Sequence, residues 1–74
     1  MLGLERELRA TITLSILDSI RQRGLSTEEA AAIAGVHPED MRTLVERRDN
    51  KGFTLEALDD VLQAIDAHGP RYGG

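Results

Sequence analysis

Cysteine and tryptophan are absent from this sequence of 74 residues, and phenylalanine and tyrosine occur once each. The lack of cysteine excludes disulfide bonds and thiolate ligands for a metal. The two histidines, His37 and His68, stand too far apart in the sequence to form a closely spaced pair of metal ligands. So few aromatic residues also argue against stacking platforms for single-stranded nucleic acid and against a β-sandwich. We therefore expect no cofactor and no metal site.

Long apolar runs and an excess of positive charge are also missing. No stretch approaches the ~18–20 apolar residues of a membrane span, and the opening MLGLERELRA carries charges where a signal peptide needs an apolar stretch. We therefore expect a cytoplasmic protein without a membrane partner. The 9 basic and 13 acidic residues give a net charge of −4, with +1 over residues 1–24, −2 over 25–48 and −3 over 49–74. Proteins that bind nucleic acid usually have the opposite balance.

Catalytic constellations are equally scarce. The chain has no cysteine nucleophile, no glycine-rich phosphate loop and no cluster of metal-ligating residues in its sequence. Because a catalytic site needs such groups in combination, the sequence predicts a binding protein and not an enzyme.

Helix-forming residues, mainly Ala, Leu, Glu and Arg, dominate what is present, and glycines divide them into helix-length pieces. Apolar residues recur at helical spacing, which predicts a small all-α domain of four to five helices. We expect helices over residues 4–23, from a capping box at Ser26–Glu29 to Gly35, over residues 38–48, and from a cap at Thr54 to Gly69-Pro70.

The first predicted helix is longer than a compact domain of this kind needs. Its apolar stripe recurs every four residues and comprises Leu4, Leu8, Ile12, Ile16 and Ile20. We expect the stripe to lie in the core, and its N-terminal half to pair with a second copy; the face near Leu55 and Leu62 is the other candidate for that pairing. The expected organisation is an arm or helix extension over 1–10, the domain over 11–69 and a flexible tail over 70–74.

The layout of residues 25–45 is the most informative feature of the sequence. A short capped helix ends at Gly35, and the next helix begins near Pro38. A short glycine-containing turn between two helices is typical of a helix-turn-helix. The small residues Ala30 and Ala31 let the two helices approach closely, and the N-terminal end of the second helix is then free to enter a DNA major groove.

These residues resemble a known family. GLSTEEAAAIAGVHPEDMRTLV resembles the Cro/lambda-repressor (xenobiotic-response-element) helix-turn-helix family, and GFTLEALDDVLQAIDAHG is similar to the helix after the reader helix in its compact, HigA-antitoxin-like branch. The resemblance covers about residues 12–69. It implies a lambda-repressor-like domain from a bacterium or phage. Such a domain acts as a repressor or as an autoregulating antitoxin, and binds a palindromic double-stranded operator as a homodimer. A toxin or another protein is an implied further partner. Where the branch usually ends the reader helix with glycine, this chain has Arg47.

The resemblance also implies roles for individual residues. It assigns base reading to His37, Glu39, Asp40, Arg42 and Thr43. It assigns phosphate contacts to Thr27, Glu28, Arg47, Arg48 and Lys51. Such roles suit the side chains, because arginine can pair with guanine O6 and N7, carboxylates can accept from cytosine N4, and helix N-termini can bind phosphate. A DNA-binding transcriptional regulator that reads the major groove with helix 38–48 is therefore the first functional hypothesis.

The same residues also have a simpler interpretation. Carboxylates in first turns and cations in last turns stabilise the helix dipole, and a histidine before a helix can cap it; this covers Glu28, Glu29, Glu39, Asp40, Arg47, Arg48 and His37. The acidic start of helix 38–48 and the net charge of −4 also motivate a second functional hypothesis. In it, the chain is a helix-turn-helix-derived protein-interaction module whose acidic face docks a basic protein partner.

Overall fold

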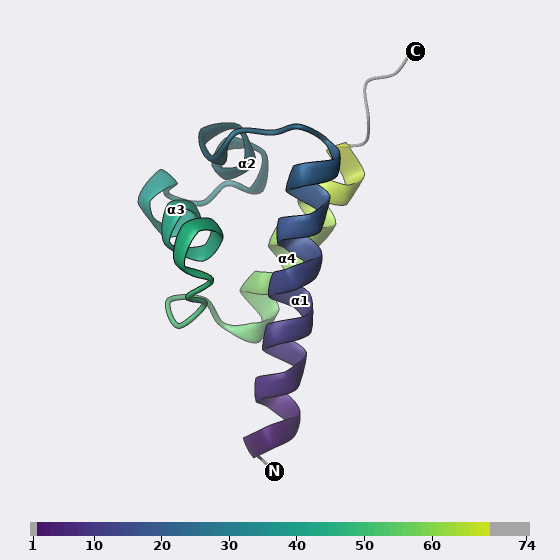
Figure 1. The fold of residues 1–74 in the computed structure, drawn as a ribbon, viewed down its shortest axis with the longest axis vertical. Coiled ribbons are helices and arrows are strands. Elements are labelled where there is room, and N and C mark those ends of the chain that lie inside the picture. The colour runs from purple at the N-terminus through teal and green to yellow at the C-terminus, as the bar shows by residue number, and fades with distance from the viewer. Residues whose placement is uncertain (1, 69–74) are drawn as a thin grey trace.

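A computed structural model of the chain describes residues 2–68. Over this range the chain forms four helices and no strand: α1 (Leu2–Gln22), α2 (Thr27–Ala34), α3 (Pro38–Arg47) and α4 (Leu55–His68) (Figure 1). The predicted all-α class is therefore confirmed. The predicted helix end at Gly69-Pro70 and the predicted tail over 70–74 lie outside the described residues.

Local signals in the sequence set most helix ends. Ser26 Oγ accepts a hydrogen bond from the Glu29 amide at 3.0 Å, and Glu29 Oε1 accepts one from the Ser26 amide at 2.8 Å, which confirms the capping box at the start of α2. Thr54 Oγ1 accepts from the Ala57 amide at 3.0 Å and caps α4, as predicted. Past the end of α1, Gly24 has a φ of 64°, a left-handed conformation that glycine adopts without steric cost.

The turn between α2 and α3 spans residues 35–37. Gly35 has a φ of 71°, and the Val36 amide donates to the Ala31 carbonyl at 3.0 Å, which reverses the chain directly after α2. His37 is the N-cap of α3, and Pro38 occupies its first turn. Because the turn is so short, α2 and α3 pack directly against each other (Figure 1).

The core lies where α1, α2, α3 and α4 meet. α1 and α4 run side by side in the same direction, and α2 packs on both α3 and α4 (Figure 1). The buried apolar side chains are Ile16, Ile20, Ala30, Ala31, Met41, Leu44, Phe53, Leu58, Val61 and Ile65. Burial of each large aliphatic member stabilises the fold by about 1.5–3 kcal/mol, so these residues hold α3 against the other helices.

The N-terminal part of α1 extends past the rest of the fold (Figure 1). Residues 2–10 continue α1 without a break, so of the two expected forms the structure has the helix extension. The expectation that the whole stripe is core is wrong for its first two members, because Leu4 is 62% exposed and Leu8 is 45% exposed. Ile12 is the first member of the stripe packed on the core.

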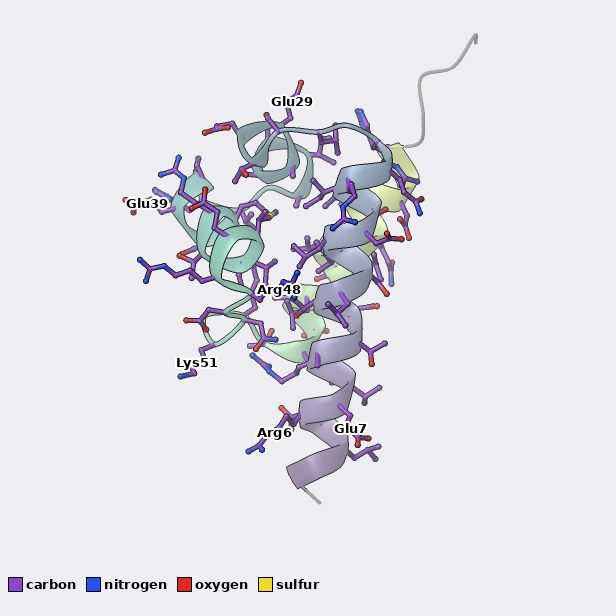
Figure 2. The ribbon with its side chains drawn as sticks, in the orientation of Figure 1. Arg6, Glu7, Glu29, Glu39, Arg48 and Lys51 are labelled. Atoms are coloured by element: carbon purple, nitrogen blue, oxygen red, sulfur yellow. The ribbon has the colours of Figure 1, made fainter. Side chains whose placement is uncertain are left out.

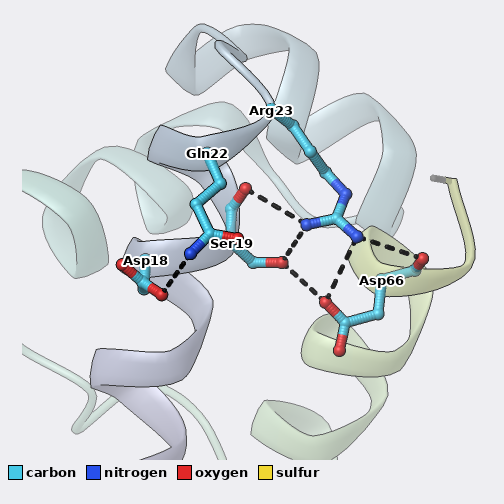
Figure 3. A network of polar contacts seen from close by, with 5 residues as sticks. All are labelled: Asp18, Ser19, Gln22, Arg23 and Asp66. Atoms are coloured by element: carbon cyan, nitrogen blue, oxygen red, sulfur yellow. Dashed lines mark hydrogen bonds and ion pairs between the residues drawn. The ribbon is translucent and has the colours of Figure 1, made fainter. Parts of the chain in front are cut away.

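A polar network joins α1 to α4 at the opposite end (Figure 3). Ser19 Oγ donates to Asp66 Oδ1 at 2.6 Å and accepts from Arg23 Nη1 at 2.6 Å. Arg23 Nη2 also lies 3.8 Å from Asp66 Oδ1. Because Ser19 is buried, its hydrogen bond to Asp66 helps to fix the position of α4 along α1, and the bond from Arg23 orients the Ser19 hydroxyl.

Candidate functional site

The outer face of α3 forms one continuous polar surface. Met41 and Leu44 point into the core and Val45 packs against it, which turns the polar side chains of α3 outward. An open surface hollow on this face is lined by Glu39, Asp40, Arg42, Thr43, Glu46 and Arg47. The structure thus brings together four of the five predicted base-reading residues. The lining contains three carboxylates and two guanidinium groups, so it offers both acceptors and donors of charge-assisted hydrogen bonds.

Two predicted base-reading residues are already engaged within α3. His37 Nδ1 accepts a hydrogen bond from the Glu39 amide at 3.2 Å, so its imidazole caps the helix. Thr43 Oγ1 donates to the Glu39 carbonyl at 3.0 Å. Glu39 and Asp40 are exposed in the first turn, where their charges also suit the helix dipole. The capping interpretation therefore describes what His37 does in the free chain.

The start of α2 reaches the same surface through an ion pair. Glu28 Oε2 lies 3.3 Å from Arg42 Nη2, and both side chains are about half exposed or more, at 65% and 49%. Thr27, the other predicted phosphate contact on α2, is half-buried at the first position of that helix. The best candidate for reading guanine is thus held by a carboxylate from the neighbouring helix.

The three predicted phosphate-binding cations do not form one cluster. Arg47 lines the hollow on α3, whereas Arg48 and Lys51 line hollows on the side of α1. The reason is the backbone at Arg48, which has a φ of 55° and is the left-handed residue that ends α3. The position at which glycine is favoured is therefore Arg48, one residue later than Arg47, where the resemblance placed it.

The loop after α3 is fastened to α1. The Arg9 guanidinium donates to the carbonyl oxygens of Asn50 and Phe53. Asn50 Nδ2 donates to Thr13 Oγ1 at 2.9 Å, and Thr13 Oγ1 donates to the Arg9 carbonyl at 2.7 Å. Sequence reasoning missed Arg9, Thr13 and Asn50, because their partners are 37 to 44 residues away along the chain. The sequence offered no signal for them beyond a polar Thr13 directly beside Ile12 of the apolar stripe.

Neither known proteins nor a metal site or membrane-spanning helix assigns a function to the described part of the chain. Comparisons with protein-family models, with curated proteins and with solved structures find no match to this chain. Among residues 2–68, no three side chains of His, Cys, Asp or Glu are gathered so that they could hold a metal ion. In the same range, none of the helices combines the length and apolarity that crossing a bilayer requires.

Proposed function

We propose that this chain is a small DNA-binding transcriptional regulator with a lambda-repressor-like helix-turn-helix fold. In this proposal it acts in the cytoplasm as a repressor or an autoregulating antitoxin. The observation that carries the proposal is the pairing of α2 with α3 across a three-residue turn, which leaves the whole polar face of α3 uncovered. A helix presented in this way fits a major groove about 12 Å wide.

The exposed groups on α3 suit that task chemically. Arg42 is placed midway along α3, where its guanidinium can make two hydrogen bonds with guanine. Arg47 at the end of α3 is an exposed cation on this face, and Arg48 and Lys51 are exposed just after it on the side of α1. Arg48 has a left-handed backbone that glycine would adopt more easily, and residues in such conformations cluster at functional sites. A palindromic operator bound by a homodimer accords with one reader helix per chain.

A second candidate function is favoured by a specific observation. Glu28 pairs with Arg42, and the first turn of α3 presents Glu39 and Asp40 to solvent. In a chain of net charge −4, this surface suits a basic protein partner, such as a toxin or another DNA-binding protein.

One double variant, compared with the wild type, separates the two functions. The wild-type chain is titrated with a random-sequence duplex from ~50 mM salt upward, where phosphate contacts give a strong salt dependence. The double variant Glu39→Gln/Asp40→Asn then binds duplex more tightly if α3 lies on DNA, because two repulsive charges are gone. The same variant binds an arginine-rich peptide more weakly if the acidic face is the docking surface.

The matched control is Glu7→Gln/Asp60→Asn, which removes two exposed carboxylates from α1 and α4. It changes the net charge equally but leaves α3 intact, so it reports the effect of overall charge alone. If wild-type protein fails to bind duplex at ~50 mM salt, where the electrostatic attraction is strongest, the regulator function is refuted.

A further inference from the structure

The N-terminal half of α1 and the loop after α3 enclose a second surface, away from the outer face of α3. One open hollow is lined by Glu5, Arg6, Arg9, Ala10, Asn50 and Lys51. An adjoining hollow shares Ala10 and Asn50 and continues to Leu14 and Arg48. Together they form a trough along α1, which we call the α1–loop trough.

The α1–loop trough has the net positive charge that the face of α3 lacks. Four cations line it, namely Arg6, Arg9, Arg48 and Lys51, against the single carboxylate of Glu5. Figure 2 shows Arg6 and Lys51 on the same side of α1, while Glu7 points to the opposite side. Within residues 2–68, no ion pair engages Arg6, Arg48 or Lys51. A chain of net charge −4 thus concentrates positive charge on this one surface.

The geometry of this trough is fixed by the internal bonds of its floor. Arg9 holds the carbonyl oxygens of Asn50 and Phe53, and Asn50 holds Thr13, so the loop cannot move far from α1. Arg9 is only partly exposed, and its guanidinium serves this purpose. Arg6 lies about one helical turn before Arg9 and is free of such bonds within the described chain. The bonds of Arg9 and Asn50 therefore fix the backbone that carries Arg6 and Lys51 before any ligand binds.

We propose that this trough binds the phosphodiester backbone of DNA, with Arg6 as a phosphate ligand beside Lys51 and Arg48. The inference rests on the proposed DNA-binding function and extends its surface onto α1. The trough adjoins the loop that leaves α3, so a duplex that receives α3 in its major groove brings a phosphate strand past Lys51. Arg6 then holds the next phosphates of that strand, and the α1 extension acquires a role in binding.

The test compares the salt dependence of duplex binding for three single variants. Each phosphate contact contributes about −0.9 to the slope of log K against log salt, and about eightfold in affinity at 0.1 M salt. Arg6→Gln and Lys51→Gln each reduce the slope by about one unit. Arg6→Lys keeps the slope, because counterion release depends on charge and not on the shape of the guanidinium.

The matched control is Arg21→Gln, an exposed arginine in the last turn of the same helix and outside the trough. It lowers the net charge by the same amount, so its slope stays near that of wild type. Thermal unfolding is followed in parallel, and exposed Arg6 makes no hydrogen bond or ion pair within residues 2–68 whose loss would lower the melting temperature of Arg6→Gln.

The outcomes distinguish the inference from the function on which it rests. If wild type binds duplex but Arg6→Gln and Arg21→Gln give the same slope, the α1–loop trough is not a phosphate site and the regulator function still stands. If wild type does not bind duplex at the lowest salt, both are overturned. A slope that falls for Arg6→Gln and recovers in Arg6→Lys supports the trough.

Discussion

Arg42 Nη2 lies 3.3 Å from Glu28 Oε2, so the central arginine of α3 is tied to the first turn of α2. Arg42, expected to read a base, and Glu28, expected to contact a phosphate, are therefore paired with each other in the free chain. The pair is largely exposed, and such pairs contribute only about 0–1 kcal/mol to stability. Its main consequence is for binding, because Arg42 has to leave Glu28 before it can contact a base.

Glu28→Gln should therefore tighten DNA binding by releasing Arg42. We expect a gain of roughly two- to fivefold, the equivalent of the ion pair that no longer has to be broken. The melting temperature should stay nearly constant. Binding to duplex is measured by fluorescence anisotropy, with Glu46→Gln as the control, because Glu46 lines the same hollow without pairing to Arg42. An equal gain from both variants would show that charge alone matters and that the ion pair does not restrain Arg42.

Arg42→Ala and Arg47→Ala should differ in kind. In the proposed function Arg42 contacts a base, so Arg42→Ala should lose discrimination at one base pair by about 1–3 kcal/mol. Arg47 is there a phosphate ligand, so Arg47→Ala should weaken binding to all sequences alike and reduce the salt slope by about one unit. Selection from a randomised duplex library supplies the preferred site for both measurements. Sequence-independent losses from both variants would contradict base reading by Arg42.

The parts of the fold that the sequence predicted are those with local causes. Ser26 and Glu29 are three residues apart, and Thr54 caps an amide three residues later, so both caps are visible in a short window. The glycine turn at Gly35 is local in the same sense. These signals placed α2, α3 and the start of α4 correctly.

The contacts that shape the candidate site join residues too far apart in the sequence to be recognised from a short segment. Arg9 meets Asn50 across 41 residues, and Glu28 meets Arg42 across 14. Leu8 has the spacing of a core residue but is exposed, because periodicity identifies a face of a helix and not whether another helix covers it. The left-handed backbone at Arg48 also lacks a sequence signal, since glycine is the residue that usually marks that conformation.

Ser19→Ala should destabilise the fold by disconnecting α1 from α4. Ser19 is buried and both donates to Asp66 and accepts from Arg23, so its loss leaves charged groups with fewer partners. We expect a loss of about 1–3 kcal/mol in the free energy of unfolding. For a domain of this size each kcal/mol lowers the melting temperature by about 4–8 °C.

Thermal unfolding of Ser15→Ala is the control for this change. Ser15 lies one turn earlier on α1 and lines the same surface hollow, but its hydroxyl makes no hydrogen bond within the described residues. Its replacement should be neutral or slightly stabilising, because alanine favours helix. If the two variants have the same melting temperature, the network in Figure 3 contributes nothing measurable.

Leu4→Gln/Leu8→Gln should weaken self-association and leave the fold unchanged. Both leucines are exposed on the part of α1 that extends past the other helices, so neither contributes to the core of a single chain (Figure 1). A homodimer that buries these leucines removes their exposed apolar surface from water, which stabilises the dimer. Glutamine keeps the helix propensity of α1 but takes away that stabilisation. Sedimentation at ~100 µM, where a dimer of about −6 kcal/mol is populated, measures the effect.

Leu14→Gln is the control, because Leu14 is also exposed but lies on a different face of α1, beside Arg48. Wild-type protein that sediments only as a monomer contradicts the pairing, and so does a dimer that weakens with Leu14→Gln but not with the double variant.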